Sequence, residues 1–71
     1  MKIIESKEDL KEAIESRFKF RRDYLEYLKS KGFDISETIL SNHLAGRKNF
    51  TNWHKMAYSF SFVCFDFEGS E

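Results

Sequence analysis

Polar side chains recur at a helical spacing between residues 35 and 45. Leu40 and Leu44, with an isoleucine beside them, would form the buried face of a helix over this segment. The polar side chains just before this face or outside it are Ser36, Glu37, Thr38, Ser41 and Asn42. Asparagine can pair with adenine, glutamate can accept from the cytosine amine, and threonine offers a hydroxyl and a methyl group. These five residues are therefore candidates for reading base edges in double-stranded DNA, although any solvent-exposed helix can carry such side chains.

Glycines must separate the elements that position these residues, because the chain contains no proline. Gly32, Gly46 and Gly69 divide it into a long N-terminal stretch, a short middle segment and an aromatic C-terminal segment. The connection over residues 31–34 is then three or four residues long and contains a glycine. Two helices joined in this way are the signature of a helix-turn-helix motif.

Capping signals predict where the first helices begin. Ser6 with Asp9 three residues later resembles a capping box, so we expect a helix to begin near Lys7. Nothing before Ser30 forces a break, and one long helix remains an alternative to two. We expect two, because the phase of the apolar residues slips at Arg21.

Similar signals predict the later helices. Asp34 with Glu37 predicts the start of the helix over residues 35–45, and Thr51 or Asn52 can cap a fourth helix. The predicted buried stripe of that fourth helix consists of Trp53, Met56, Ala57 and Phe60.

The C-terminal segment alternates aromatic and polar residues, so the helix could continue or a short strand could begin. It carries too many aromatic side chains to leave them all in water. They would pack back on the core or against a second copy of the chain, and both arrangements remain open. We favour a dimer contact through Phe62, Phe65 and Phe67.

Together these patterns predict an all-α fold. We expect one domain over residues 1–71, with four to five helices and the helix-turn-helix at about residues 20–46. A short strand or helix extension could follow at the C-terminus. A chain of 71 residues is near the lower limit for a single core, and 17% aromatic residues help to supply that core.

The segment Ile35–Phe50 resembles the recognition helix and following loop of the Cro/repressor (XRE) helix-turn-helix family. The resemblance rests on a small capping residue, a polar pair, an aliphatic residue and a serine, followed by Gly46-Arg47-Lys48-Asn49. It continues over residues 53–60, which are similar to the closing helix of the family. The chain departs from the family at residues 24–28, which are bulky where a small residue is usual, and at His43, where an aliphatic residue is common.

This resemblance implies a transcriptional regulator of phage-repressor type that binds double-stranded DNA sequence-specifically, as a homodimer on a pseudo-palindromic operator. The preceding helix of such a motif crosses the phosphate backbone, and the family makes backbone contacts after the recognition helix. The candidate phosphate-binding residues are Arg21, Arg22, Arg47, Lys48 and Asn49. The alternative for the two earlier arginines is a role in solubility or an ion pair with Asp23 or Glu26.

The distribution of charge permits this interpretation without establishing it. The net formal charge is zero, but Arg17–Lys55 contains nine basic and four acidic residues, a net charge of +5. The first sixteen residues carry a net −2 and the last sixteen a net −3. A basic centre of this kind would steer the chain towards phosphate groups.

Other classes of function find little support in the sequence. No catalytic constellation or glycine-rich phosphate loop is present, so we expect neither an enzyme nor a cofactor. His43, His54 and Cys64 lack the spacing of a zinc site, and we expect no metal. The single cysteine, the charged N-terminus and the lack of a long apolar run suggest a cytoplasmic protein without a membrane span.

The rival hypothesis is a small protein-binding module on the same scaffold. The zero net charge and the aromatic C-terminal segment would suit a protein that binds a host factor, or an antitoxin that binds DNA and a toxin protein. Substitutions in the aromatic segment would then matter more than substitutions in the basic loop.

Overall fold

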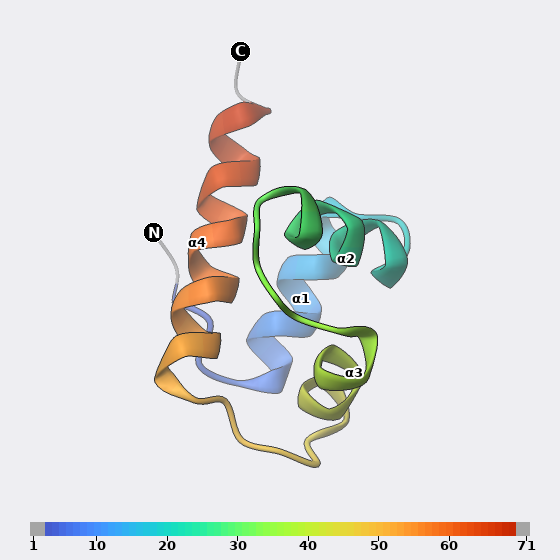
Figure 1. Cartoon of the computed structure of the whole chain (residues 1–71), viewed down its shortest axis with the longest axis vertical. Helices are drawn as coiled ribbons and strands as arrows, with labels where there is room; N and C mark the ends of the chain where they lie inside the picture. The colour runs from blue at the N-terminus through green and yellow to red at the C-terminus, as the bar shows by residue number, and fades with distance from the viewer. Residues whose placement is uncertain (1–2, 70–71) are drawn as a thin grey trace.

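The computed structural model describes residues 3–69 and consists of four helices with no strand in that range (Figure 1). They are α1 (Lys7–Arg17), α2 (Arg21–Ser30), α3 (Glu37–Ala45) and α4 (Asn52–Glu68). This confirms the all-α fold and shows that the C-terminal segment continues as a helix rather than forming a strand. No helix among these residues is long and apolar enough to cross a membrane.

The N-terminal half forms two helices, as the slip in apolar phase predicts. Ser6 caps α1, because its side chain accepts a hydrogen bond from the backbone N–H of Asp9. Phe18 and Phe20 have extended backbone conformations and separate α1 from α2. The break therefore lies just before Arg21.

Gly32 ends α2 through its left-handed backbone conformation, with φ of +84°. The N–H of Gly32 donates to the carbonyl of Lys29 at 3.1 Å, and the N–H of Phe33 donates to that of Leu28 at 3.0 Å. This pair of bonds is a Schellman motif, which satisfies carbonyls that the helix end leaves free.

The start of α3 differs from the prediction. Ser36 caps the helix by accepting from the N–H of Ile39 at 3.2 Å, so Asp34 is not the cap. The connection between α2 and α3 is longer than the three or four residues expected, since residues 31–36 lie outside both helices. Ile35 is buried in this connection, where it anchors the chain just before α3.

Aromatic residues form the centre of the core between α2 and α4. The rings of Tyr24 and Phe62 stack with centroids 4.8 Å apart, and Phe18 lies 5.3 Å from Tyr24. The Ser61 hydroxyl donates to the Tyr58 carbonyl at 2.7 Å, so the Tyr24 hydroxyl donates to Ser61 at 2.7 Å. Ser61 is therefore buried without an unsatisfied polar group.

The buried face of α4 is not the predicted one. Of the expected stripe only Ala57 is buried, whereas Trp53, Met56 and Phe60 are largely exposed. The residues that α4 does bury are Ala57, Tyr58, Ser59, Ser61 and Phe62. The helix is turned so that Tyr58 and Phe62 meet Tyr24, and its two buried serines hydrogen-bond within the protein.

This orientation also corrects the predicted dimer contact. Phe62 is only 4% exposed and lies within the core of one chain, so it cannot meet a second copy. Phe65 is half-buried and packs against Phe18, with ring centroids 4.6 Å apart. Of the three predicted residues, only Phe67 points into solvent.

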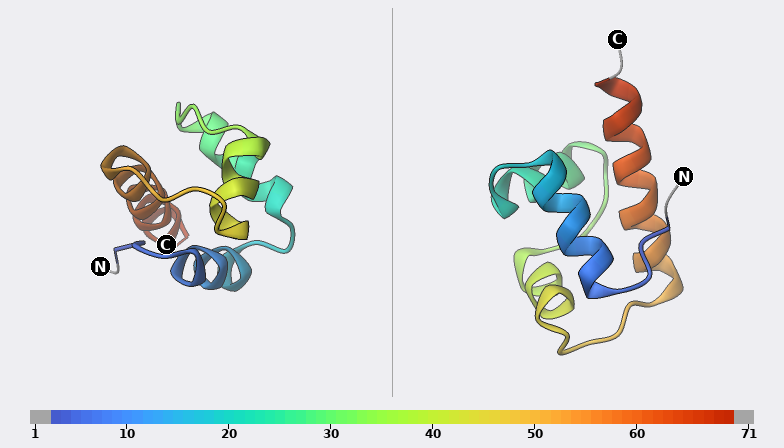
Figure 2. Two further views of the ribbon diagram at one scale, coloured as in Figure 1. Left: turned by 90° about the horizontal axis from the view of Figure 1, so that it is seen from below. Right: turned by 180° about the vertical axis from the view of Figure 1, so that it is seen from behind.

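Two ion pairs hold the C-terminal half of α4 against the other helices. Arg17 of α1 binds Asp66 through two hydrogen bonds of 2.7 Å, and its guanidinium lies 5.0 Å from the centre of the Phe62 ring. Lys31, at the end of α2, pairs with Glu68. Figure 2 shows the resulting arrangement, with α4 along one side of the domain and the three shorter helices packed beside it.

Candidate nucleic-acid interface

The outer face of α3 is defined by what the helix buries. Leu40 and His43 face the core, while Thr38 on the other side is exposed and Ser41 and Asn42 are half-buried. Glu37, in the first turn, and the cap Ser36 are also exposed. The five predicted base-reading residues therefore lie along the outer face and at the start of α3. Ser36 differs from the others because its oxygen already caps the helix.

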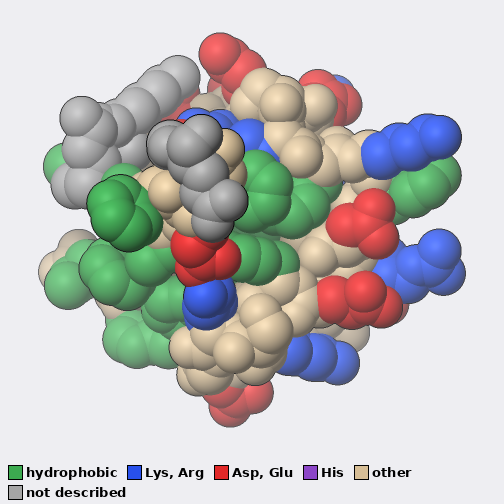
Figure 3. Space-filling model, turned by 90° about the horizontal axis from the view of Figure 1, so that it is seen from above, with side chains coloured by type: hydrophobic (Ala, Val, Ile, Leu, Met, Phe, Trp, Pro, Cys, Tyr) green, Lys and Arg blue, Asp and Glu red, His purple; other side chains and the backbone are tan. Residues whose placement is uncertain are grey.

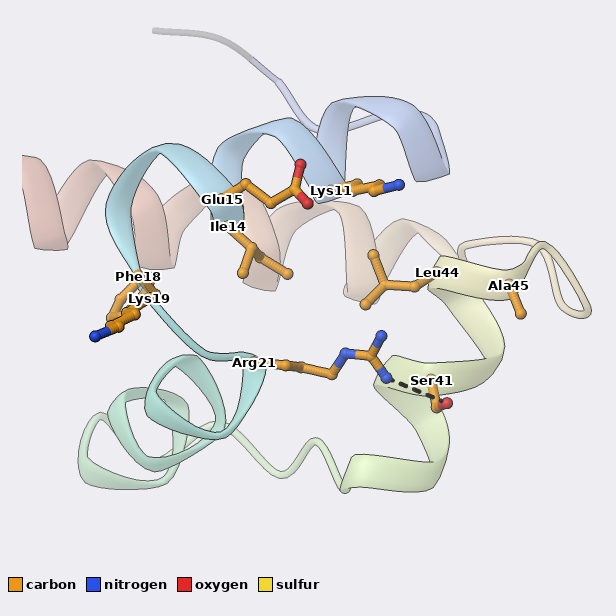
Figure 4. A pocket seen from close by; sticks show the side chains of 9 residues that line it. All are labelled: Lys11, Ile14, Glu15, Phe18, Lys19, Arg21, Ser41, Leu44 and Ala45. Carbon is orange, nitrogen blue, oxygen red and sulfur yellow. Dashed lines mark hydrogen bonds between the residues drawn. The ribbon is translucent and has the colours of Figure 1, made fainter.

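Arg21 crosses from the start of α2 to the outer face of α3. Its guanidinium donates to the Ser41 hydroxyl at 3.4 Å, next to a hollow of about 380 Å³ between α1, α2 and α3 (Figure 4). Lys11 and Lys19 also line this hollow, with Glu15 as its one acidic residue. A phosphate candidate thus lies directly beside a base-reading candidate.

Gly46 positions the other arginine of the interface. It ends α3 with φ of +77°, and the N–H of Arg47 donates to the Asn42 carbonyl at 2.9 Å, which completes a second Schellman motif. The side chain of Arg47 then donates to the Asn42 side-chain oxygen at 3.2 Å. The glycine that the sequence motif emphasises is therefore the residue that brings Arg47 to Asn42.

Two lysines near α3 were missed by sequence reasoning. The side chain of Lys7 covers Gly46, with Nζ 3.0 Å from where a β-carbon would lie on that glycine. Lys11 lines the hollow beside Ala45. Both belong to the N-terminal segment, whose net charge is negative, so the net charge of that segment gave no indication of a basic surface. The spacing of four residues, which places them on one face of α1, was the available signal.

The remaining candidates lie at the edges of this surface. Lys48 and Asn49 are exposed and share a second hollow with Lys7 and His43. Arg22 is exposed in the first turn of α2. The structure thus brings Arg21 and Arg47 onto α3 itself and leaves Arg22 farther along α2.

A buried histidine, His43, packs between α3 and α4. Nδ1 of His43 and the Tyr58 hydroxyl share a hydrogen bond of 2.7 Å, and the rings of Phe50 and His54 pack against His43 at 4.8 and 4.5 Å. Burial, with His54 and Lys48 nearby, lowers the pKa of His43, and burial also lowers the pKa of His54. Both rings are therefore neutral at neutral pH, which suits their position between α3 and α4.

The His43 side chain makes a contact that an aliphatic side chain could not make. An aliphatic residue at this position could not bond the hydroxyl of Tyr58, which is itself fully buried. Among residues 3–69, no three side chains of the metal-binding types gather closely enough to hold an ion.

No protein-family model, curated protein or solved structure matches the chain. The interpretation of this surface therefore depends on its own geometry.

Proposed function

We propose that the protein binds double-stranded DNA sequence-specifically through α3, as a transcriptional regulator of phage-repressor type. The observation that supports this proposal is the pairing of arginines with polar residues on α3. Arg21 donates to Ser41, and Arg47 donates to Asn42. Each pair combines a cation suited to phosphate with a side chain suited to a base edge.

The charges around α3 favour the same function. Lys7 and Lys11 from α1 and Lys48 from the loop add to the two arginines. Phosphate contacts from such residues would orient α3, and Thr38 and Asn42 would then distinguish base pairs in the major groove. When DNA binds, the Asn42 side chain would give up its hydrogen bond to Arg47 and bond a base instead. The Arg47 guanidinium would then be free to bind a phosphate of the DNA backbone.

One small domain makes few DNA contacts, so we propose that it acts as a homodimer on an inverted repeat. Dimers of this type of motif read half-sites about one helical turn apart. The protein-binding alternative is supported by the exposed apolar residues on α4.

The test is a salt titration of binding to mixed genomic duplex fragments, followed by sequencing of the fragments retained. Affinity that falls steeply with salt, together with an enriched inverted repeat, is the expected result. Absence of binding at roughly 50 mM salt, where phosphate contacts are strong, would contradict the proposal.

Charge-matched variants separate this surface from general electrostatics. Arg47→Ala/Lys48→Ala should remove most binding. Lys29→Ala/Lys31→Ala removes the same charge at the far end of α2, where Lys31 pairs with Glu68, and should retain it. Asn42→Ala should weaken binding to the selected sequence by roughly 1–3 kcal/mol while affecting other sequences less. Full binding by the Arg47→Ala/Lys48→Ala variant would contradict the assignment.

A further inference from the structure

Helix α4 has a second apolar face that the domain does not cover. The residues of this outer stripe are Trp53, Met56, Phe60, Val63 and Phe67, with exposed fractions from 37% for Val63 to 83% for Phe67. Their spacing alternates between three and four residues. That spacing is the a/d pattern of a coiled-coil heptad, which places all five on one side of a helix.

The outer stripe lies away from the core. Tyr58 and Phe65, which face the rest of the domain, are about half a turn around α4 from it. Hydrophobic side chains gather on the α4 side of the molecule in Figure 3, whereas Lys and Arg side chains project from the other side. Ile3 extends the apolar surface, since it is 52% exposed and lines a shallow hollow with Met56 and Phe60.

The size of this surface matches one half of a stable protein interface. Large side chains contribute roughly 150–250 Å² each, so the exposed fractions of the outer stripe and Ile3 together leave roughly 700 Å² on each chain. A standard interface buries about 800 Å² per partner. Monomeric proteins usually expose apolar patches of no more than roughly 300–600 Å².

We infer that the outer stripe pairs with the same stripe of a second copy, with the two α4 helices antiparallel. An a/d stripe fits another stripe of equal spacing, and an identical chain supplies one. In the antiparallel register, Met56 lies opposite Phe67 of the other copy, and Phe60 lies opposite Val63.

The helix dipole favours the antiparallel direction. Antiparallel pairing places the N-terminal end of each α4, which carries a partial positive charge, beside the C-terminal end of the other, which carries a partial negative charge. Within α4, no acidic residue in the first turn and no basic residue in the last turn offsets these partial charges.

This inference rests on the proposed function, because the outer stripe would be the surface through which the DNA-binding homodimer forms. The stripe contains no residue of α3. Oligomeric state can therefore be measured without DNA, and DNA binding can be measured separately. A monomer that still binds DNA would overturn only the dimer surface, whereas a dimer that binds no DNA would overturn only the proposed function.

The first test is sedimentation equilibrium of the whole chain. We expect a dimer for the wild type and at least a tenfold weaker association for Met56→Gln/Phe67→Gln, which removes apolar contacts at both ends of the stripe. Phe20→Gln is the matched control, because Phe20 is 54% exposed at the start of α2, away from the stripe. It should dimerise like the wild type. Circular dichroism verifies that all variants remain helical.

The second test is disulfide formation between single-cysteine chains in a Cys64→Ser background. In the antiparallel register, two copies of residue 56 are roughly 16 Å apart along the helix axis, too far for a disulfide. A mixture of Met56→Cys and Phe67→Cys chains should therefore form a cross-linked heterodimer, and neither should cross-link alone. Cross-linking of each variant with itself would overturn the antiparallel arrangement. A monomeric wild type at 100 µM or more, together with no cross-link, would overturn the proposal as a whole.

Discussion

The buried imidazole of His43 makes the stability of the fold depend on pH. His43 is buried between α3 and α4, and its pKa and that of His54 lie below the ordinary value of 6.5. The unfolded chain therefore takes up protons before the folded chain does as the pH falls. Linkage then requires the free energy of unfolding to decrease below about pH 6.5 and to be fully retained above it.

We predict a loss of stability between pH 7 and pH 5.5, with a slope of at most about 1.4 kcal/mol per pH unit for each histidine. Urea unfolding across this range measures it. His43→Gln keeps a group that can bond Tyr58 but cannot titrate, so its profile should be flatter than that of the wild type. Equal slopes for the two proteins would show that His43 does not couple folding to pH.

Two glycines with similar backbone angles allow a matched comparison. Gly32 and Gly46 both have positive φ, but a β-carbon at Gly32 would meet nothing, whereas one at Gly46 would press on Lys7. Alanine at either position should cost about 1 kcal/mol of stability because of its left-handed conformation. Thermal unfolding measures this cost.

Gly46→Ala should also weaken DNA binding, since it displaces Lys7 and Arg47, and Gly32→Ala should not. Equal DNA affinities for the two variants would contradict a positioning role for Gly46.

At the scale of elements, the glycines and most cap residues were readable from the sequence because they act locally, although Ser36 rather than Asp34 caps α3. Ser6 and Gly46 could be placed without knowing the fold, and so could the end of α2 at Gly32. The face that α4 buries could not be predicted, since both of its faces carry aromatic residues. The choice depends on Tyr24, which stacks on Phe62 and bonds Ser61. A serine in the core looks like a surface residue until its partner is known.

The Tyr24–Ser61 bond predicts unequal costs for its two partners. Tyr24→Phe leaves Ser61 bonded to the Tyr58 carbonyl and should cost about 1 kcal/mol. Ser61→Ala leaves the buried Tyr24 hydroxyl unpaired and should cost more, about 1–3 kcal/mol. Urea unfolding of both single variants and the double variant measures the difference. The double variant should lose less than the two single variants combined, and strict additivity would contradict a direct bond.

At the scale of the whole molecule, charge and apolar surface are separated. The chain has no net charge, yet cations from α1, α2 and the loop after α3 surround α3, and the outer stripe of α4 carries none. The sequence pattern identified the loop and the outer face of α3. It did not identify Lys7 and Lys11, because only the packing of α1 against α3 brings them there.

The salt dependence of DNA binding tests this separation residue by residue. Removing a side chain that binds one phosphate should reduce the slope of log affinity against log salt by about 0.9. We therefore predict a reduction of about one for Lys11→Gln and for Lys7→Gln, and none for Lys31→Gln, which lies with Glu68 at the end of α4. Binding isotherms at several salt concentrations measure the slopes. If Lys31→Gln lowers the slope as much as Lys11→Gln does, DNA responds to the total charge of the molecule rather than to the surface around α3. The cations contributed by α1 would then have no specific role in binding.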